Sequence, residues 1–160
     1  MGLINHNGTV ALTCHLNLEN PDRPSLSVDF FNGLPEVIHL FDSPRLPYFI
    51  LREDGSLLIL FGVNPPDPDI DYSMIEIPLT RPLPPGESVA WQVDLVDFHL
   101  KDHYQAAWEP AELHGPTPVA VQVGWGLTAI EPEDRSRTNI NTLLEWQNLA
   151  ECTAGEFVFP

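Results

Sequence analysis

Apolar and polar residues alternate along most of this chain with a period of two. The pattern is clearest in residues 10–18, 26–30, 89–95 and 119–125. Alternate side chains of a β-strand point to opposite faces of a sheet, so this period is typical of strands with one buried face. Helical spacing is scarce, and the pattern predicts many short strands.

Two apolar runs, 48–51 and 57–61, flank the segment Arg52-Glu53-Asp54-Gly55-Ser56. An Asp-Gly pair between apolar runs is a strong signal for a tight turn between antiparallel strands. We therefore predict a β-hairpin here.

A Pro-Pro-Gly turn at 84–86 opens onto the longest alternating run, 83–100. Its apolar positions change parity, from Val89, Trp91, Val93 and Leu95 to Val96, Phe98 and Leu100. A slip of one residue turns the wrong face inward, so we predict a β-bulge or a sharp bend near Leu95-Val96.

The remaining segments are less regular. Residues 62–73 predict an exposed loop, Met74–Leu79 a short strand that ends at Pro78, and 81–87 a turn. The stretch 101–117 lacks alternation, and we place a short helical turn near 104–108. In the tail, Thr142 and Glu145 match a capping box, which favours a helix over Leu143–Ala150, but strand positions fit as well. We expect a strand at the end of the chain.

Roughly eight or nine short strands without a βαβ rhythm indicate an all-β protein in which two antiparallel sheets pack face to face. The length of 160 residues suits one domain over 1–160. An immunoglobulin-like β-sandwich is the leading prediction, and a jelly roll or an open barrel is the alternative.

The net charge of the chain limits the kinds of partner that it can bind. It carries 23 acidic and seven basic residues, for a net charge of −16. Such a surface repels phosphate, which argues against nucleic-acid binding and against docking on anionic membranes. A charged partner is therefore expected to be a basic protein or a cation.

Cys14 and Cys152 lie near opposite ends of the chain. Residues 1–20 lack the basic start and apolar stretch of an export signal, so we expect a cytoplasmic protein. Disulfides are rare in the cytoplasm. We therefore expect Cys14 to be a core thiol, and no disulfide.

Metal-binding chemistry has two candidates. Asp67, Asp69 and Asp71 have the spacing that opens a calcium loop, but Tyr72 and Pro78 occupy the positions that require Gly and Glu. We expect a solvated acidic loop that is available for binding. His99 and His103 have ligand types that zinc uses, although their spacing converges on a metal only in a helix.

Tyr104 and Trp108 are the aromatic residues that strand alternation explains least. Exposed aromatic residues in loops are frequent binding anchors. The alternative is that both fold back and cover one end of the sandwich.

Three segments together resemble the bacterial intracellular proteinase-inhibitor family and its immunoglobulin-like relatives. They are the strand ending in Leu18-Glu19-Asn20, the hairpin from Pro47 to Gly55, and the turn Leu83-Pro84-Pro85-Gly86-Glu87-Ser88. The resemblance covers about residues 9–95 and implies an immunoglobulin-like fold, with protease inhibition as one form of protein binding. It assigns no inhibitory residue.

We thus expect a non-catalytic module that binds a protein partner through loops at one end or through an edge strand, without a cofactor. The surfaces indicated are residues 62–73 and 101–117, which contain Asp67, Asp69, Asp71, Tyr104 and Trp108. The alternative is a small metal-assisted enzyme that uses His99 and His103.

Overall fold

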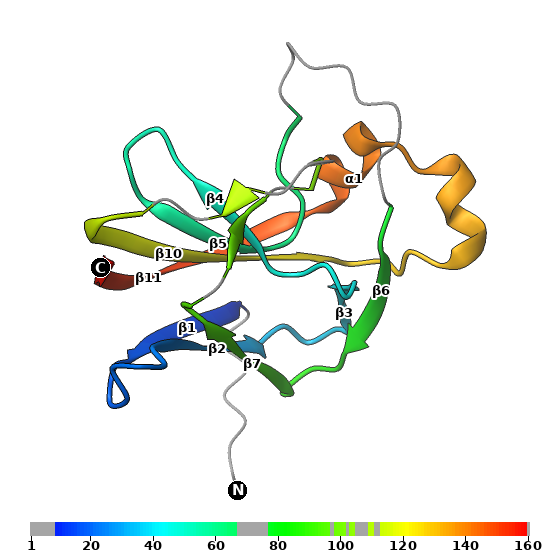
Figure 1. Cartoon of the computed structure of the whole chain (residues 1–160). Helices are drawn as coiled ribbons and strands as arrows, with labels where there is room; N and C mark the ends of the chain where they lie inside the picture. Colours follow the sequence, from blue (N-terminus) through cyan, green and yellow to red (C-terminus); the bar gives the residue numbers. More distant parts are fainter. Residues whose placement is uncertain are drawn as a thin grey trace, which may run out of the picture.

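The structure is a computed structural model that describes residues 9–66, 77–96, 98–101, 103–104, 109–110 and 113–159. Figure 1 shows its elements. In chain order they are β1 (Val10–Asn17), β2 (Ser25–Asn32), β3 (Ile38–Asp42), β4 (Tyr48–Leu51), β5 (Leu57–Phe61), β6 (Leu79–Leu83), β7 (Ser88–Asp94), β8 (His99–Leu100), β9 (Glu109–Pro110), β10 (Gly115–Gly126), a 3-10 helix (Pro132–Arg137), α1 (Ile140–Trp146) and β11 (Asn148–Phe159).

The strands form two main sheets that face each other. The smaller sheet has the order β1-β2-β7, and the larger has the order β4-β5-β10-β3-β6 with β11 paired to β10. In Figure 1 the smaller sheet lies below the larger. The short strands β8 and β9 pair with each other. The all-β prediction is confirmed.

Side chains from both sheets form one core. Leu26, Val28 and Phe30 of β2 are fully buried, and Val119, Val121 and Val123 of β10 are at most 1% exposed. These residues belong to the same apolar cluster. The two central strands therefore turn their apolar faces into a shared interior, as the period of two requires.

The larger sheet is mixed, although antiparallel sheets were expected. Strand β10 runs parallel to β5, with Val119 opposite Leu57 and Val123 opposite Phe61. Parallel neighbours need a long connection. Residues 62–114, which lie between the two strands in the chain, provide it.

The predicted hairpin is confirmed as β4 and β5. Gly55 has a φ of 87°, which suits glycine and few other residues. The Asp54 carboxylate accepts hydrogen bonds from the Ser56 amide at 2.9 Å and from the Ser56 hydroxyl at 2.6 Å. These local bonds fix the turn.

The bend predicted near Leu95-Val96 is also confirmed. β7 ends at Asp94, and His99–Leu100 belongs to a different sheet. Leu95 is 3% exposed and Val96 is 42% exposed. The bend therefore keeps the first apolar set, which includes Leu95, buried while the chain turns away from the smaller sheet.

Several sequence predictions need correction. The loop predicted as exposed over 62–73 begins buried, since Val63 is 2% exposed and packs with Phe41 and Leu143. Residues 79–83, placed at the end of a strand and in a turn, form β6, in which Pro82 is tolerated because β6 is an edge strand. Residues 115–117, placed in the irregular stretch, begin β10. Residues 74–76 and 105–108 lie outside the described part of the chain.

In the tail, both a helix and a strand form. α1 begins after Asn139, whose side chain accepts a hydrogen bond from the Thr142 amide at 2.9 Å. The cap is therefore Asn139, not Thr142. The helix ends at Trp146, and β11 follows with Phe157 and Phe159 buried, so the predicted terminal strand is confirmed.

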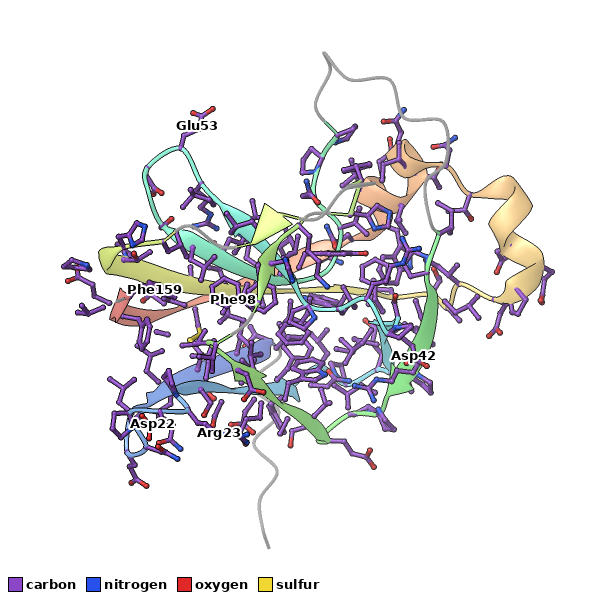
Figure 2. All side chains as sticks on the ribbon, in the orientation of Figure 1. Asp22, Arg23, Asp42, Glu53, Phe98 and Phe159 are labelled. Carbon is purple, nitrogen blue, oxygen red and sulfur yellow. A yellow bond between two sulfur atoms is a disulfide. The ribbon has the colours of Figure 1, made fainter. Side chains whose placement is uncertain are left out.

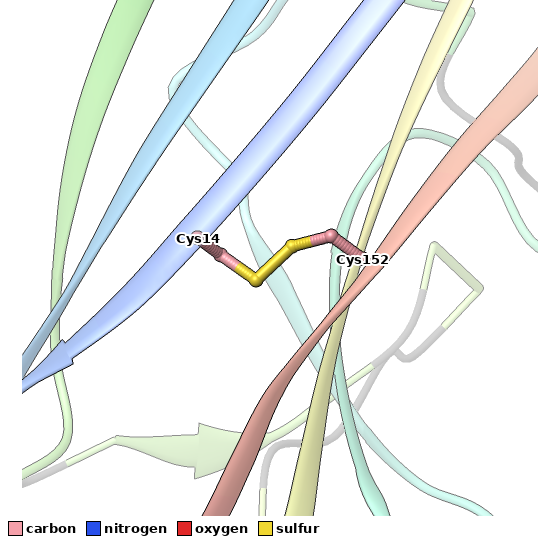
Figure 3. Close-up of a disulfide and its surroundings, with 2 residues drawn as sticks. All are labelled: Cys14 and Cys152. Atoms are coloured by element: carbon pink, nitrogen blue, oxygen red, sulfur yellow. A yellow bond between two sulfur atoms is a disulfide. The ribbon is translucent and has the colours of Figure 1, made fainter.

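The expectation of a free Cys14 thiol is wrong. Cys14 of β1 and Cys152 of β11 form a disulfide (Figure 3), with Cα atoms 6.4 Å apart. β1 is an edge strand of the smaller sheet, and β11 hydrogen-bonds to β10 alone among the described strands. The bond therefore ties the two sheets together along one side of the sandwich.

We predict that Cys14→Ala with Cys152→Ala lowers the free energy of unfolding by about 2–5 kcal/mol, because the unfolded chain loses a crosslink that closes a long loop. Urea unfolding under oxidising conditions measures the loss. Reductant should destabilise the native chain by a similar amount and leave the double variant unchanged. Equal stability of the oxidised native chain and the double variant would contradict the prediction.

Candidate functional site

His103 and Tyr104, both singled out from the sequence, lie in a buried cluster with Tyr48. They are 4% and 6% exposed. The Tyr48 hydroxyl lies 3.2 Å from His103 Nδ1, and the His103 amide donates to Asn64 Oδ1 at 3.2 Å. The Tyr104 hydroxyl donates to the Asn64 carbonyl. Tyr104 is therefore packed rather than exposed, and it folds back next to the Tyr48 cluster on the outer face of the larger sheet, not over an end of the sandwich.

Lys101, the only lysine of the chain, joins the segment that contains His103 and Tyr104 to β4. Its amide donates to the Phe49 carbonyl at 2.7 Å, and its carbonyl accepts from the Phe49 amide at 3.0 Å. Its Nζ lies 5.9 Å from the centre of the Tyr48 ring. Burial, and to a lesser extent the charge of Arg45, lowers the pKa of Lys101. The segment thus occupies part of the outer edge of β4.

His99 and His103 differ in their surroundings. His99 is exposed on β8, opposite Pro110, whereas His103 is buried with its Nδ1 next to the Tyr48 hydroxyl. Within the described residues, no group of three or more His, Cys, Asp or Glu side chains is placed to hold a metal ion. Asp67, Asp69, Asp71 and Trp108 lie outside these residues.

A cleft of about 310 Å³ opens between the two sheets beside β7. This volume is at the lower end of the range for ligand sites. Its walls come from β3, the loop after β3, β5, β6 and β7. The lining residues are Phe41, Asp42, Ser43, Leu46, Pro47, Phe61, Arg81, Trp91, Gln92 and Val93.

The apolar wall of the cleft is built across the two sheets. Phe61 of β5 and Trp91 of β7 stack with ring centres 4.3 Å apart and planes at 21°. Such a stack adds to the free energy of apolar burial. It holds the two sheets in contact beside the opening of the cleft.

Two charged groups border the same cleft. Arg81 of β6 lies opposite Leu40 of β3, and Asp42 lies opposite Leu79. Figure 2 labels Asp42 at this side of the molecule. Among the described residues, neither Arg81 nor Asp42 makes an ion pair or a side-chain hydrogen bond.

Sequence reasoning missed this cleft. Arg81 was placed in a turn, and Trp91 was recognised only as a strand position. The available signal was the charge of Arg81 at an alternating position between Leu79 and Leu83. This signal is recognisable only when residues 79–83 are known to form a strand.

A separate charged cluster lies on the outer face of the larger sheet. The Glu151 carboxylate accepts hydrogen bonds from Gln122 Nε2 at 2.6 Å and from Arg52 Nη2 at 3.0 Å. The bond from Gln122 and then the bond and charge of Arg52 lower the pKa of Glu151. The cluster links the β4–β5 turn to β10 and β11.

Comparisons with known proteins add no relative: no family model, no curated protein and no solved structure matches this chain. In the part of the chain that the structure describes, no helix has the length and apolarity to cross a membrane.

We predict a pH-dependent effect of Glu151→Gln. Because the folded pKa of Glu151 is depressed, its stabilising effect is present above the unfolded pKa and is lost as the pH falls through the folded pKa. The variant should be less stable by about 0.2–1 kcal/mol at neutral pH, the range for exposed ion pairs. This difference should shrink toward zero as the pH falls below the folded pKa of Glu151.

Denaturant unfolding at several pH values measures the difference. Glu156→Gln is the matched control, since Glu156 lies on the same strand and makes no ion pair among the described residues. A difference for Glu151→Gln that stays constant down to acidic pH would contradict the prediction.

Proposed function

We propose that this chain is a non-catalytic, immunoglobulin-like interaction module that binds an extended segment of a protein partner along the free edge of β7. In this mode of binding, a peptide becomes an additional strand of a sheet. Backbone hydrogen bonds then supply affinity, and pockets for alternate side chains supply specificity.

The backbone of β7 supports this proposal. β7 is an edge strand that pairs with β2 alone among the described strands. The Leu95 amide donates to the Pro24 carbonyl at 3.0 Å, and the Asn32 amide donates to the Glu87 carbonyl at 2.9 Å. In an antiparallel ladder, hydrogen-bonded positions alternate. The positions that direct their amides and carbonyls to the free edge are therefore Ser88, Ala90, Gln92 and Asp94.

The cleft beside β7 is the observation that carries the proposal. Trp91, Gln92 and Val93 of β7 line it, together with residues of the opposite sheet. A strand added at this edge would place every second side chain over the cleft. Backbone groups and side-chain pockets would thus be available to the same peptide.

Two other edge strands, β4 and β1, already carry links to other parts of the chain. Lys101 bridges to Phe49 on β4, and the disulfide joins β1 to β11. The loop surfaces expected from the sequence lie partly outside the described residues. No observation in the described part of the chain favours the metal-assisted enzyme, so we propose one function.

The disulfide also bears on the compartment. A cytoplasmic location was expected from the sequence, whereas the Cys14–Cys152 bond favours an oxidising compartment, in which disulfides persist. We propose that the module works there. Protease inhibition, which the family resemblance implies, is one form that partner binding takes under this proposal.

The test is selection of binding peptides from a random octapeptide display library, followed by amide hydrogen exchange of the module with a selected peptide. We expect protection to rise at Ala90, Gln92 and Asp94. Ala90→Pro removes an amide donor at the free edge without removing a bond to β2, and it should weaken peptide binding about tenfold or more.

Ala90→Thr is the matched control, because it changes an exposed side chain and retains the backbone donor. It should bind peptide as the native module does. Failure to select any peptide, protection confined to another strand, or full binding by Ala90→Pro would each overturn the proposal.

A further inference from the structure

We propose that the segment added to β7 carries one acidic side chain facing the cleft, and that Arg81 binds its carboxylate. This inference rests on the function proposed above and names the class of peptide that the site takes. The pattern is an acidic residue with apolar residues two positions before and after it.

Arg81 projects toward the space between the sheets. Its cross-strand partner Leu40 is 2% exposed and belongs to the core, as does Leu83, which is 6% exposed and two residues along β6. Paired residues and residues two apart share one face of a sheet. Arg81 therefore enters the cleft from the inner face of β6.

The guanidinium of Arg81 has no hydrogen-bond or ion-pair partner among the described residues. This is unusual in a chain with 23 acidic and seven basic residues. A partly buried guanidinium presents several donors in a planar fork that matches a carboxylate, and charged groups removed from water are costly unless they are paired. A ligand carboxylate would supply the missing acceptor.

A side chain of the added strand is the source of that carboxylate. Arg81 reaches the cleft from the sheet opposite β7, and inward-facing side chains of a strand next to β7 point toward that sheet. The apolar residues Leu46 and Pro47 suit apolar neighbours on the same face of the peptide. Asp42 at the cleft repels a second acidic side chain.

The test uses acetyl-Thr-Val-Thr-Glu-Thr-Val-Thr-amide, which has Val, Glu and Val on one face and no terminal charge. Its counterpart carries Gln in place of Glu. Both are titrated by calorimetry into the native module, Arg81→Gln and the control Arg23→Gln, whose Arg23 is exposed in the β1–β2 turn (Figure 2).

We expect the native module and Arg23→Gln to bind the Glu peptide about tenfold more tightly than the Gln peptide, the gain of a charge-assisted hydrogen bond. Arg81→Gln should bind both peptides equally. The preference should decrease as salt concentration rises.

The outcomes separate the two proposals. Equal binding of both peptides by the native module, with exchange protection at Ala90, overturns the role of Arg81 and leaves strand addition intact. If Arg81→Gln still prefers the Glu peptide, the role of Arg81 is likewise overturned and strand addition is left intact. If neither peptide binds while displayed peptides protect β7, the predicted pattern is wrong, and if no peptide protects β7, the proposed function is wrong as well.

Discussion

The fold is held together by burial of the inner faces of the two sheets against each other. The central strands β2 and β10 contribute side chains that are almost completely removed from water. Each buried aliphatic or aromatic side chain contributes about 1.5–3 kcal/mol. Because the inner positions recur at every second residue, the alternate positions face outward: Asp29 of β2 is exposed, whereas Ala120 of β10 is covered by the Tyr48 cluster.

The two sides of the sandwich are closed in different ways. Along one side, the disulfide between β1 and β11 is a covalent link between the sheets. Along the β7 side, the stack of Phe61 on Trp91 joins the sheets without a covalent bond, and a cleft remains beside it. A covalently closed side keeps the sheets together while the other side has room for a ligand.

The distribution of charge follows the same division. Glu151 has its charge satisfied by Arg52 and Gln122 on the outer face, where the interaction is screened by solvent. Arg81 lies in the cleft without such a partner among the described residues. A cationic side chain that lines a cleft and has no internal partner can bind an acidic group of a ligand. The proposed specificity therefore depends on Arg81.

Features that arise between near neighbours could be predicted from the amino-acid sequence alone. The hairpin of β4 and β5 follows from Asp54 and Gly55, and the bend after Asp94 follows from the change of apolar parity. Alternation also identified the buried face of β2 and β10. These signals are strong because turn geometry and side-chain direction depend on a few consecutive residues.

Contacts between distant segments could not be predicted in this way. Alternation shows that Cys14 faces inward, but it does not show that Cys152, 138 residues away, lies opposite it. The parallel pairing of β5 with β10 and the position of Arg81 in the cleft depend on the same long-range choice. Gly126 is a further case, since a Cβ there would collide with the Trp146 ring of α1. A period of two specifies a face for each side chain, whereas its partner is selected by the packing of the whole chain.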